Sequence, residues 1–481
     1  MNSKLDLFTF GLIIAAAICA LVPVGLAAQS FSGGFIEKSN NPGARPRLTR
    51  SQIQSFLPSE RGKFRFPAPY NTEGIRITVP ADCGGKDCVS PVGYSYWMNT
   101  NNHAGSDTML IFLGLDRRKG GSGLTLFSYN KSTDEVKKLG PVFDSSTPYS
   151  WHHGDGWYFS ASQPTKLYFS YDGPQLYRYD VLAKSTQTVF DVAGRFGADK
   201  SIAQTHSSGD DRVHSATLRC KKAGCSDGTR KAAKDEEMMG CLVYNESTRQ
   251  FSYYPRKGDF DECQIDQSGR WLFIIEDVDG IDPGEADNRI VDLHTGAERT
   301  LLYHQKKIRG TDYGRVAHVD MGYGYVIGTD PAHIRPHAKL LYRFDKDPLQ
   351  GVLVYYTRDW SHPAPNHITH RNAKPNLPPE RQYACGSDAD RENKTRPDDV
   401  VCFPLDGSLN TLVVAPVMTD PNAAGDCDEY CKQPKGNLDV TGRYFIWTSN
   451  MGGNRLDAFI VKVPAELLSS NPTPAGNKTV R

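Results

Sequence analysis

The sequence predicts an all-β fold, a seven-bladed β-propeller in which an N-terminal strand closes the last blade. Three observations lead to this prediction. One strand-and-turn pattern recurs seven times, a glycine turn followed by an aromatic strand accompanies several copies, and helical periodicity is nearly absent. The stretch "TRSQIQSFL", residues 49–57, is the best candidate for a short helix.

The recurring pattern is an apolar strand that ends in an aromatic or aliphatic residue followed by Asp or Asn, as in "CLVYNEST". The seven copies end at Asn130, Asp180, Asn245, Asp292, Asp345, Asp406 and Val463. They are 50, 65, 47, 53, 61 and 57 residues apart, which fits blades of roughly 40 to 50 residues with insertions. Asp and Asn suit the following hairpin turn, because their side chains accept hydrogen bonds from nearby backbone N–H groups. Two stacked β-sandwiches are the main competing interpretation.

The second shared element is a glycine turn that leads into an aromatic strand, as in "GDGWYFS", "SGRWLFI", "GYGYVIG" and "TGRYFIW". We interpret this turn as the connection between the innermost strand of a blade and its neighbour. The last copy is followed only by turn-like sequence, so the last blade needs a strand from elsewhere. "KFRFPAPY" or "GIRITVP", near the N-terminus, is expected to supply it.

The start of the chain predicts export. Lys4 precedes a long apolar run, and small residues follow at Gly25 and Ala27, which is typical of a secretory signal peptide over residues 1–28. A retained membrane anchor is the alternative. We expect an N-terminal extension at residues 29–64, the propeller at 65–465 and a flexible tail at 466–481. No second long apolar run exists, so we expect a mature chain without a transmembrane segment, secreted to the extracellular space or the periplasm.

Charge and composition narrow the function. The 481 residues include 56 basic and 55 acidic side chains, a formal net charge of +1, which argues against a nucleic-acid partner. The 44 glycines and 30 prolines indicate a turn-rich globular chain. We expect a monomer that binds a polysaccharide or a cell-surface ligand.

The cysteines predict disulfides. Ten of the 11 cysteines lie in the mature part, and an even count in an exported chain is typical of disulfides. The simplest local pairs are Cys83–Cys88, Cys385–Cys402 and Cys427–Cys431. We favour Cys220–Cys241 as a fourth pair, because Cys241 and Cys402 each stand four residues before a marker and each follows an insertion that begins near a cysteine. The pairing of Cys225 and Cys263 stays open.

Histidines lie just before the glycine turn in four of the seven copies, where the blade model places residues near one mouth of the central channel. They are His152 and His153, His206, His318, and His367 with His370; Gln264 holds the place in copy four. Neutral imidazole is a common metal ligand, so Gln264, His206, His318, His367 and His370 are candidate ligands for a divalent ion such as Mn, Ca or Zn. The alternative is that each histidine bonds to a neighbouring blade.

A secreted seven-bladed propeller with histidines at the channel mouth resembles the oligogalacturonate-lyase type of propeller, and more loosely TolB-type repeats. The likeness covers the repeats from about residue 75 to 465. The resemblance implies a divalent metal held by several histidines and a glutamine, and catalysis by a histidine and an arginine. By position, Gln264, His318, His367 and His370 match the metal role, although an insertion follows "NHITHRN" where the lyases continue into a strand.

The chemistry implied is β-elimination from a uronate, which needs a base for the C5 proton and a cation for the carboxylate. We predict His153 as the base and Arg212 as the carboxylate partner, with Trp151 and His152 in contact with the substrate. The acids of "DDR", residues 210–212, and "DFDE", residues 259–262, are expected to be solvated turns. The alternative function is a non-catalytic extracellular propeller that binds a glycan or protein through its loops.

Overall fold

The computed structural model describes residues 30–147, 149, 156–220, 237–280, 286–302, 314–330, 338–356, 367–387, 389, 398–425 and 429–469. Residues Phe31–Arg481 form one compact unit. The predicted signal peptide and residues 470–481 of the predicted tail lie outside the described residues. No helix in the described ranges is long and apolar enough to cross a membrane.

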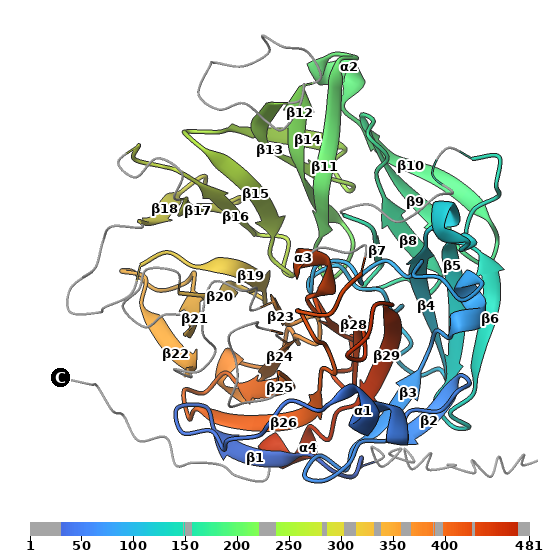
Figure 1. Cartoon of the computed structure of the whole chain (residues 1–481). Helices are drawn as coiled ribbons and strands as arrows, with labels where there is room; N and C mark the ends of the chain where they lie inside the picture. Colours follow the sequence, from blue (N-terminus) through green and yellow to red (C-terminus); the bar gives the residue numbers. More distant parts are fainter. Residues whose placement is uncertain are drawn as a thin grey trace, which may run out of the picture. The chain divides into compact units, whose positions relative to one another are not determined.

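Seven small antiparallel sheets surround a central channel, so the predicted seven-bladed β-propeller is confirmed (Figure 1). We number these sheets as blades 1 to 7 in chain order. Blades 1 to 4 contain β4 (Thr108–Leu115), β5 (Gly123–Asn130) and β6 (Val136–Pro141); β7 (Tyr158–Phe159), β8 (Lys166–Phe169), β9 (Gln175–Asp180) and β10 (Ser185–Asp191); β11 (Lys200–Ser207), β12 (Val213–Cys220), β13 (Glu237–Asn245) and β14 (Gln250–Pro255); and β15 (Phe260–Ile265), β16 (Trp271–Glu276), β17 (Asp287–Asp292) and β18 (Glu298–Leu301).

Blades 5 to 7 follow the same plan, with additions from the N-terminus. They contain β19 (Ala317–Met321), β20 (Tyr325–Thr329), β21 (Lys339–Arg343) and β22 (Gly351–Tyr355); β23 (His367–Thr369), β24 (Tyr383–Ser387), β25 (Asp399–Pro404), β26 (Asn410–Pro416) and β1 (Phe35–Lys38); and β27 (Asn437–Leu438), β28 (Tyr444–Ser449), β29 (Asp457–Lys462), β3 (Glu73–Arg76) and β2 (Gly62–Arg65). The helical segments are short: α1 (Arg50–Phe56), α2 (Ala193–Phe196), α3 (Glu429–Lys432) and α4 (Glu466–Ser469), with 3-10 turns η1 (Pro80–Cys83), η2 (Arg117–Lys119) and η3 (Pro379–Arg381).

Six of the seven predicted markers end, or closely follow, the strand that leads into the last hairpin of their blade, while Val463 follows β29, beside which the N-terminal strand β3 pairs. The side chains act as the turn chemistry predicts. Asn130 Oδ1 accepts hydrogen bonds from the backbone N–H groups of Ser132 and Thr133, both at 3.0 Å. Asp180 Oδ1 accepts from Leu182 N in the same way, at 3.0 Å. The helix predicted near residues 49–57 is α1, which begins with a capping box between Thr49 and Gln52.

Both predicted closing segments join the last blade. Strand β3 pairs with β29, with Ile75 opposite Ile460, and β2 pairs with β3 on the outside. The propeller ring is therefore closed by N-terminal and C-terminal strands in one sheet (Figure 1). Strand β1, from the predicted extension, adds a fifth strand to blade 6 by pairing with β26.

One alignment of the repeats is wrong. "SGRWLFI", "GYGYVIG" and "TGRYFIW" form β16, β20 and β28, which are second strands of their blades, as predicted. "GDGWYFS" instead contains β7, the innermost strand of blade 2, whose second strand is β8. The "WHHGDG" stretch therefore precedes an innermost strand rather than following one, because glycine turns occur at both places in a blade.

The apolar core lies between neighbouring blades. One cluster joins blade 7 to blade 1, where Ile75 and Tyr444 pack with Met109 and Ile111. Similar clusters join blades 1 and 2, 2 and 3, 3 and 4, and 4 and 5, and the largest spans blades 5, 6 and 7. Each blade is thus held by burial of its two faces against its neighbours.

Two aspartates clasp adjacent blades at the turn between the first and second strands. In "IDQSGRW", Asp266 Oδ1 accepts from Trp271 N at 2.9 Å, and Asp266 Oδ2 accepts from Gly324 N of blade 5 at 2.8 Å. In "LDVTGRY", Asp439 Oδ1 accepts from Tyr444 N at 2.7 Å. Its Oδ2 lies 3.0 Å from His103 Nε2 before blade 1, and both side chains are fully buried. The same motif therefore builds a turn and links it to the next blade.

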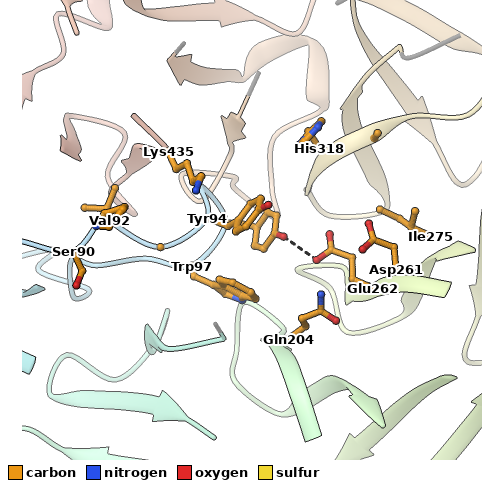
Figure 2. Close-up of a pocket in the computed structure, with 14 residues that line it drawn as sticks. Ser90, Val92, Tyr94, Trp97, Gln204, Asp261, Glu262, Ile275, His318 and Lys435 are labelled. Carbon is orange, nitrogen blue, oxygen red and sulfur yellow. Dashed lines mark hydrogen bonds between the residues drawn. The ribbon is translucent and has the colours of Figure 1, made fainter. Parts of the chain in front are cut away.

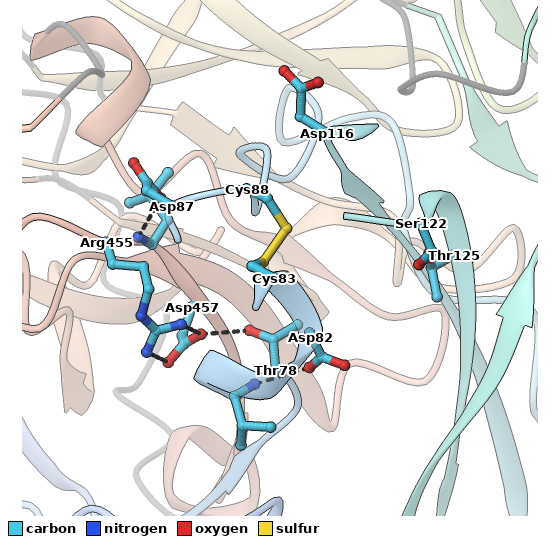
Figure 3. Close-up of a disulfide and its surroundings, with 12 residues drawn as sticks. Thr78, Asp82, Cys83, Asp87, Cys88, Asp116, Ser122, Thr125, Arg455 and Asp457 are labelled. Atoms are coloured by element: carbon cyan, nitrogen blue, oxygen red, sulfur yellow. Dashed lines mark hydrogen bonds and ion pairs between the residues drawn. A yellow bond between two sulfur atoms is a disulfide. The ribbon is translucent and has the colours of Figure 1, made fainter. Parts of the chain in front are cut away.

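Three disulfides are described, and one predicted pair is wrong. Cys83–Cys88 and Cys385–Cys402 form as predicted, the former beside the buried Asp457 network (Figure 3). Cys241 pairs with Cys263 rather than with Cys220. This bond joins β13 of blade 3 to β15 of blade 4, so it connects two blades instead of closing an insertion. Cys220 and Cys431 are also disulfide-bonded, while Cys225 and Cys427 lie outside the described residues.

Candidate functional site

A cavity of about 430 Å³ opens at one mouth of the central channel (Figure 2). The innermost strands β15 and β19 contribute near their first residues, with Asp261, Glu262 and His318 in the lining. The cavity therefore lies at the end of the channel where innermost strands begin. The connections between second and third strands reach the same face of the propeller.

The segment 90–97 supplies an aromatic wall of this cavity. The rings of Tyr94 and Tyr96 stack with centroids 5.5 Å apart, and Trp97 meets Tyr96 edge to face at 5.0 Å. Trp97 Nε1 donates to Thr205 O of blade 3 at 2.9 Å, which fixes the indole. This wall was not predicted from the sequence, although the three aromatic residues of "YSYW" stand ahead of the first repeat.

Two innermost strands are distorted where they line the cavity. Gln204 in β11 and His318 in β19 adopt left-handed backbone conformations with φ of 48° and 47°. The register shifts at both places, between Ala203 and His206 and between Ala317 and Asp320. Such bulges re-aim side chains, and strained non-glycine residues cluster at functional sites.

The cavity carries both signs of charge. Glu262 is buried, and its carboxylate accepts from Tyr96 Oη at 2.8 Å and from Gln264 Nε2 at 2.9 Å. Asp261 is exposed beside it (Figure 2). Lys435, across the cavity, places its ammonium 5.5 Å from the centroid of the Tyr94 ring. The expectation that "DFDE" is a solvated turn is therefore wrong for Glu262, because a strand and not a turn carries it.

The predicted histidines are distributed along a chain of ring contacts. His318 lies 5.3 Å from His367, and His367 lies 4.9 Å from Tyr94. His206 lies 5.0 Å from Tyr96, on the far side of the stacked tyrosine pair. Two aromatic rings thus stand between His206 and the pair His318 and His367 in this chain.

His370 and Gln264 have their polar atoms engaged. His370 Nε2 lies 2.6 Å from Tyr325 Oη, and its Nδ1 lies 3.0 Å from Tyr383 O. Burial, together with the charge of Arg371, lowers the pKa of His370 to about 4 and that of His206 to about 3, so both rings are neutral near pH 7. The Gln264 amide donates to Glu262. The structure thus brings His318 and His367 together and places His206, His370 and Gln264 against other partners, and the ligand role of these residues stays a prediction.

Of the residues predicted for catalysis and substrate contact, only Arg212 lies among the described residues. Trp151, His152 and His153 lie outside the described residues. Arg212 occupies the turn between β11 and β12, at the opposite end of the channel from the cavity. Its side chain is 71% exposed and pairs with Asp210 at 3.8 Å. The neighbouring Asp211 is buried and accepts from Ser160 Oγ at 2.5 Å, so the solvated-turn expectation for "DDR" is wrong at that residue.

Among the described residues, one group of His, Cys, Asp or Glu side chains brings three ligand atoms within 4.8 Å of one another, and so could hold a metal ion. It consists of Asp277 and Asp279, in the connection after β16 of blade 4, and Asp287, the first residue of β17. This connection reaches the same propeller face as the cavity. The "DVDG" stretch, residues 277–280, was not among the sites predicted from the sequence.

No family model matches the sequence, and no curated protein sequence matches it. Solved structures similar to it include an oligogalacturonate lyase from Vibrio parahaemolyticus, with a TM-score of 0.58 at 10% identity, over 91% of this chain and 100% of that one. An oligogalacturonate lyase in complex with manganese has a TM-score of 0.55 at 12% identity, over 85% and 98%. TolB from Acinetobacter baumannii has a TM-score of 0.37 at 12% identity, over 78% and 85%. At these identities the likeness shows the fold alone: the chain shares its seven-bladed β-propeller with these lyases.

Proposed function

We propose that this chain is an exported propeller that binds a uronate-containing polysaccharide at the channel mouth and cleaves it there by β-elimination. The observation that carries the proposal is the aromatic wall of Tyr94, Tyr96 and Trp97, which lines one cavity together with His318 and Lys435. Aromatic faces pack against the apolar faces of sugar rings. The disulfides suit an oxidising extracellular or periplasmic compartment.

The elimination can be assigned to groups of this chain. A cation beside the uronate carboxylate makes the C5 proton more acidic, and a neutral imidazole accepts that proton while the C4–O bond breaks. The leaving oxygen takes a proton from water or an acid. Lys435 is the ammonium at the cavity, and His318 is the imidazole in its lining. Arg212 has no part in this assignment, and His153 stays a prediction.

The first test measures binding of trigalacturonate by titration calorimetry. Replacing the half-buried Tyr94 with alanine removes one stacking face, and we expect affinity to fall about tenfold, or about 1.4 kcal/mol. Tyr171→Ala is the matched control, because Tyr171 is 43% exposed on blade 2 and outside the cavity lining. Equal affinities of the two variants would place the sugar elsewhere.

A charge test uses the exposed Asp261. Its carboxylate repels a uronate, so Asp261→Asn should strengthen trigalacturonate binding about fivefold in chelator-treated buffer, for charges about 4 Å apart in water. Added Mn²⁺ or Ca²⁺ should strengthen binding to the wild type more than to Asp261→Asn. Asp210→Asn removes the same charge from a side chain that is 60% exposed at the other end of the channel, and should change nothing. Weaker binding by Asp261→Asn would contradict the uronate assignment.

The alternative is a non-catalytic glycan-binding propeller. Elimination creates a C4–C5 double bond that absorbs ultraviolet light, whereas binding alone creates none. Trigalacturonate that binds in a Tyr94-dependent manner without any rise in ultraviolet absorbance would establish the binding module and remove the lyase.

A further inference from the structure

Arg371 is a buried arginine whose hydrogen-bonding capacity is unmet. It follows β23 of blade 6, and its side chain is 8% exposed. Within the described part of the chain, Nε has no hydrogen-bond partner, and the carboxylate oxygen within 4.0 Å is Asp320 Oδ1 at 3.9 Å. A guanidinium carries five N–H donors, and a buried one is normally paired.

The charge of Arg371 acts on groups from several blades. Burial lowers the pKa of His206 in blade 3, and it raises the pKa of Asp320 in blade 5 to about 6 and that of Tyr158 in blade 2. The charge of Arg371 acts to lower all three. Because β23 is the innermost strand of blade 6, Arg371, two residues after its end, lies near the axis of the propeller. It is separate from the cavity of Figure 2, whose lining does not include it.

Asp320 does not take up the donors of Arg371. Its Oδ1 accepts from Met321 N at 2.8 Å, and its Oδ2 accepts from His370 N at 2.5 Å. These two backbone donors hold the carboxylate away from a close pair with the guanidinium. A second unsatisfied atom lies on the blade 3 side, where His206 Nε2 is buried without a hydrogen-bond partner among the described residues.

We propose that Arg371 anchors an anion-binding site inside the central channel and that its ligand is a small carboxylate. The planar fork of the guanidinium matches the two oxygens of a carboxylate. A monovalent anion is favoured over phosphate, because the Asp320 carboxylate lies beside the site. His206 Nε2, protonated in the neutral ring, would donate to the same ligand. The proposal does not require the glycan function.

The test titrates wild-type protein with ¹³C-formate and follows the carbon resonance, with chloride at equal ionic strength as the reference. We expect saturable binding to the wild type and a loss of more than about tenfold in affinity for Arg371→Met, the size expected for hydrogen bonds to a charged group. Arg371→Lys keeps the charge but not the fork and should bind with intermediate affinity. Arg118→Met, at a side chain that is 70% exposed, is the matched control and should bind like the wild type.

Formate binding that is unchanged in Arg371→Met, or absent from the wild type together with absent galacturonate binding, would overturn the site. Should Arg371→Met fail to fold, the comparison of Arg371→Lys with wild type decides by the same measure. Galacturonate replaces formate in a second arm. Binding of galacturonate but not formate that depends on Arg371 would identify a sugar carboxylate as the ligand. Loss of the Tyr94 effect on trigalacturonate with the Arg371 effect intact would remove the proposed function and leave this site standing.

Discussion

Asp439→Ala should lower the free energy of unfolding by about 3–5 kcal/mol, because each buried donor left without its acceptor costs about 1–3 kcal/mol. The variant leaves His103 buried without its partner and removes the acceptor for Arg443 N and Tyr444 N at 2.8 and 2.7 Å. Urea denaturation followed by tryptophan fluorescence measures the loss. Asp210→Ala, in the equivalent turn of blade 3 but exposed, should cost less than about 0.5 kcal/mol.

The difference in stability between wild type and Asp439→Ala should disappear at acidic pH. Burial alone would raise the pKa of Asp439, but the hydrogen bonds from His103, Thr441 and the backbone outweigh burial and hold it below its usual range. A carboxyl group whose pKa is lowered by folding stabilises the fold above the unfolded pKa of about 3.9, and that contribution is lost as pH falls through the folded value. The gap between wild type and Asp439→Ala should therefore narrow below about pH 4. A difference of less than 1 kcal/mol in the free energy of unfolding at pH 7 would contradict the proposed role of Asp439 in linking blade 7 to blade 1.

Removing the Cys241–Cys263 bond by a double alanine substitution should cost about 3 kcal/mol, because the bond closes a loop with a separation of 22 residues. The matched control is Cys83→Ala with Cys88→Ala, where the separation is 5 residues and about 2 kcal/mol is expected. Urea denaturation of both double variants makes the comparison.

Because the Cys241–Cys263 bond joins two blades, its removal should also have a local effect that can be measured. Hydrogen exchange should rise at β13 and β15 in the Cys241 and Cys263 variant, since the bond joins these strands of blades 3 and 4. Peptide mapping of the wild type should recover Cys241 linked to Cys263. A Cys241 peptide linked to Cys220 would restore the pairing that the sequence suggested.

The number of blades could be predicted because the blade is a local unit. An apolar strand followed by Asn130 or Asp180 and a turn builds its hairpin from neighbouring residues, whose turn chemistry is visible in sequence. Ring closure by the N-terminal strands follows from counting, since the last copy lacks a strand. The sequence could not show which strand of blade 2 "GDGWYFS" forms, because a glycine turn occurs both before the innermost strand β7 and before the second strand β16.

The sequence by itself determined the propeller, its seven blades, its closure and two of the described disulfides, since each depends on short separations or on a repeated pattern. The tertiary structure alone decided what meets in the channel. Tyr94, Glu262, His318 and Lys435 come from different blades or loops, and bulges in the innermost strands set where the side chains of Glu262 and His318 point. A bulge shifts the strand register, so a one-residue change moves a side chain to the other face, and no sequence pattern marks it. The partner of Cys241 was decided in the same way, by the packing of one blade against the next.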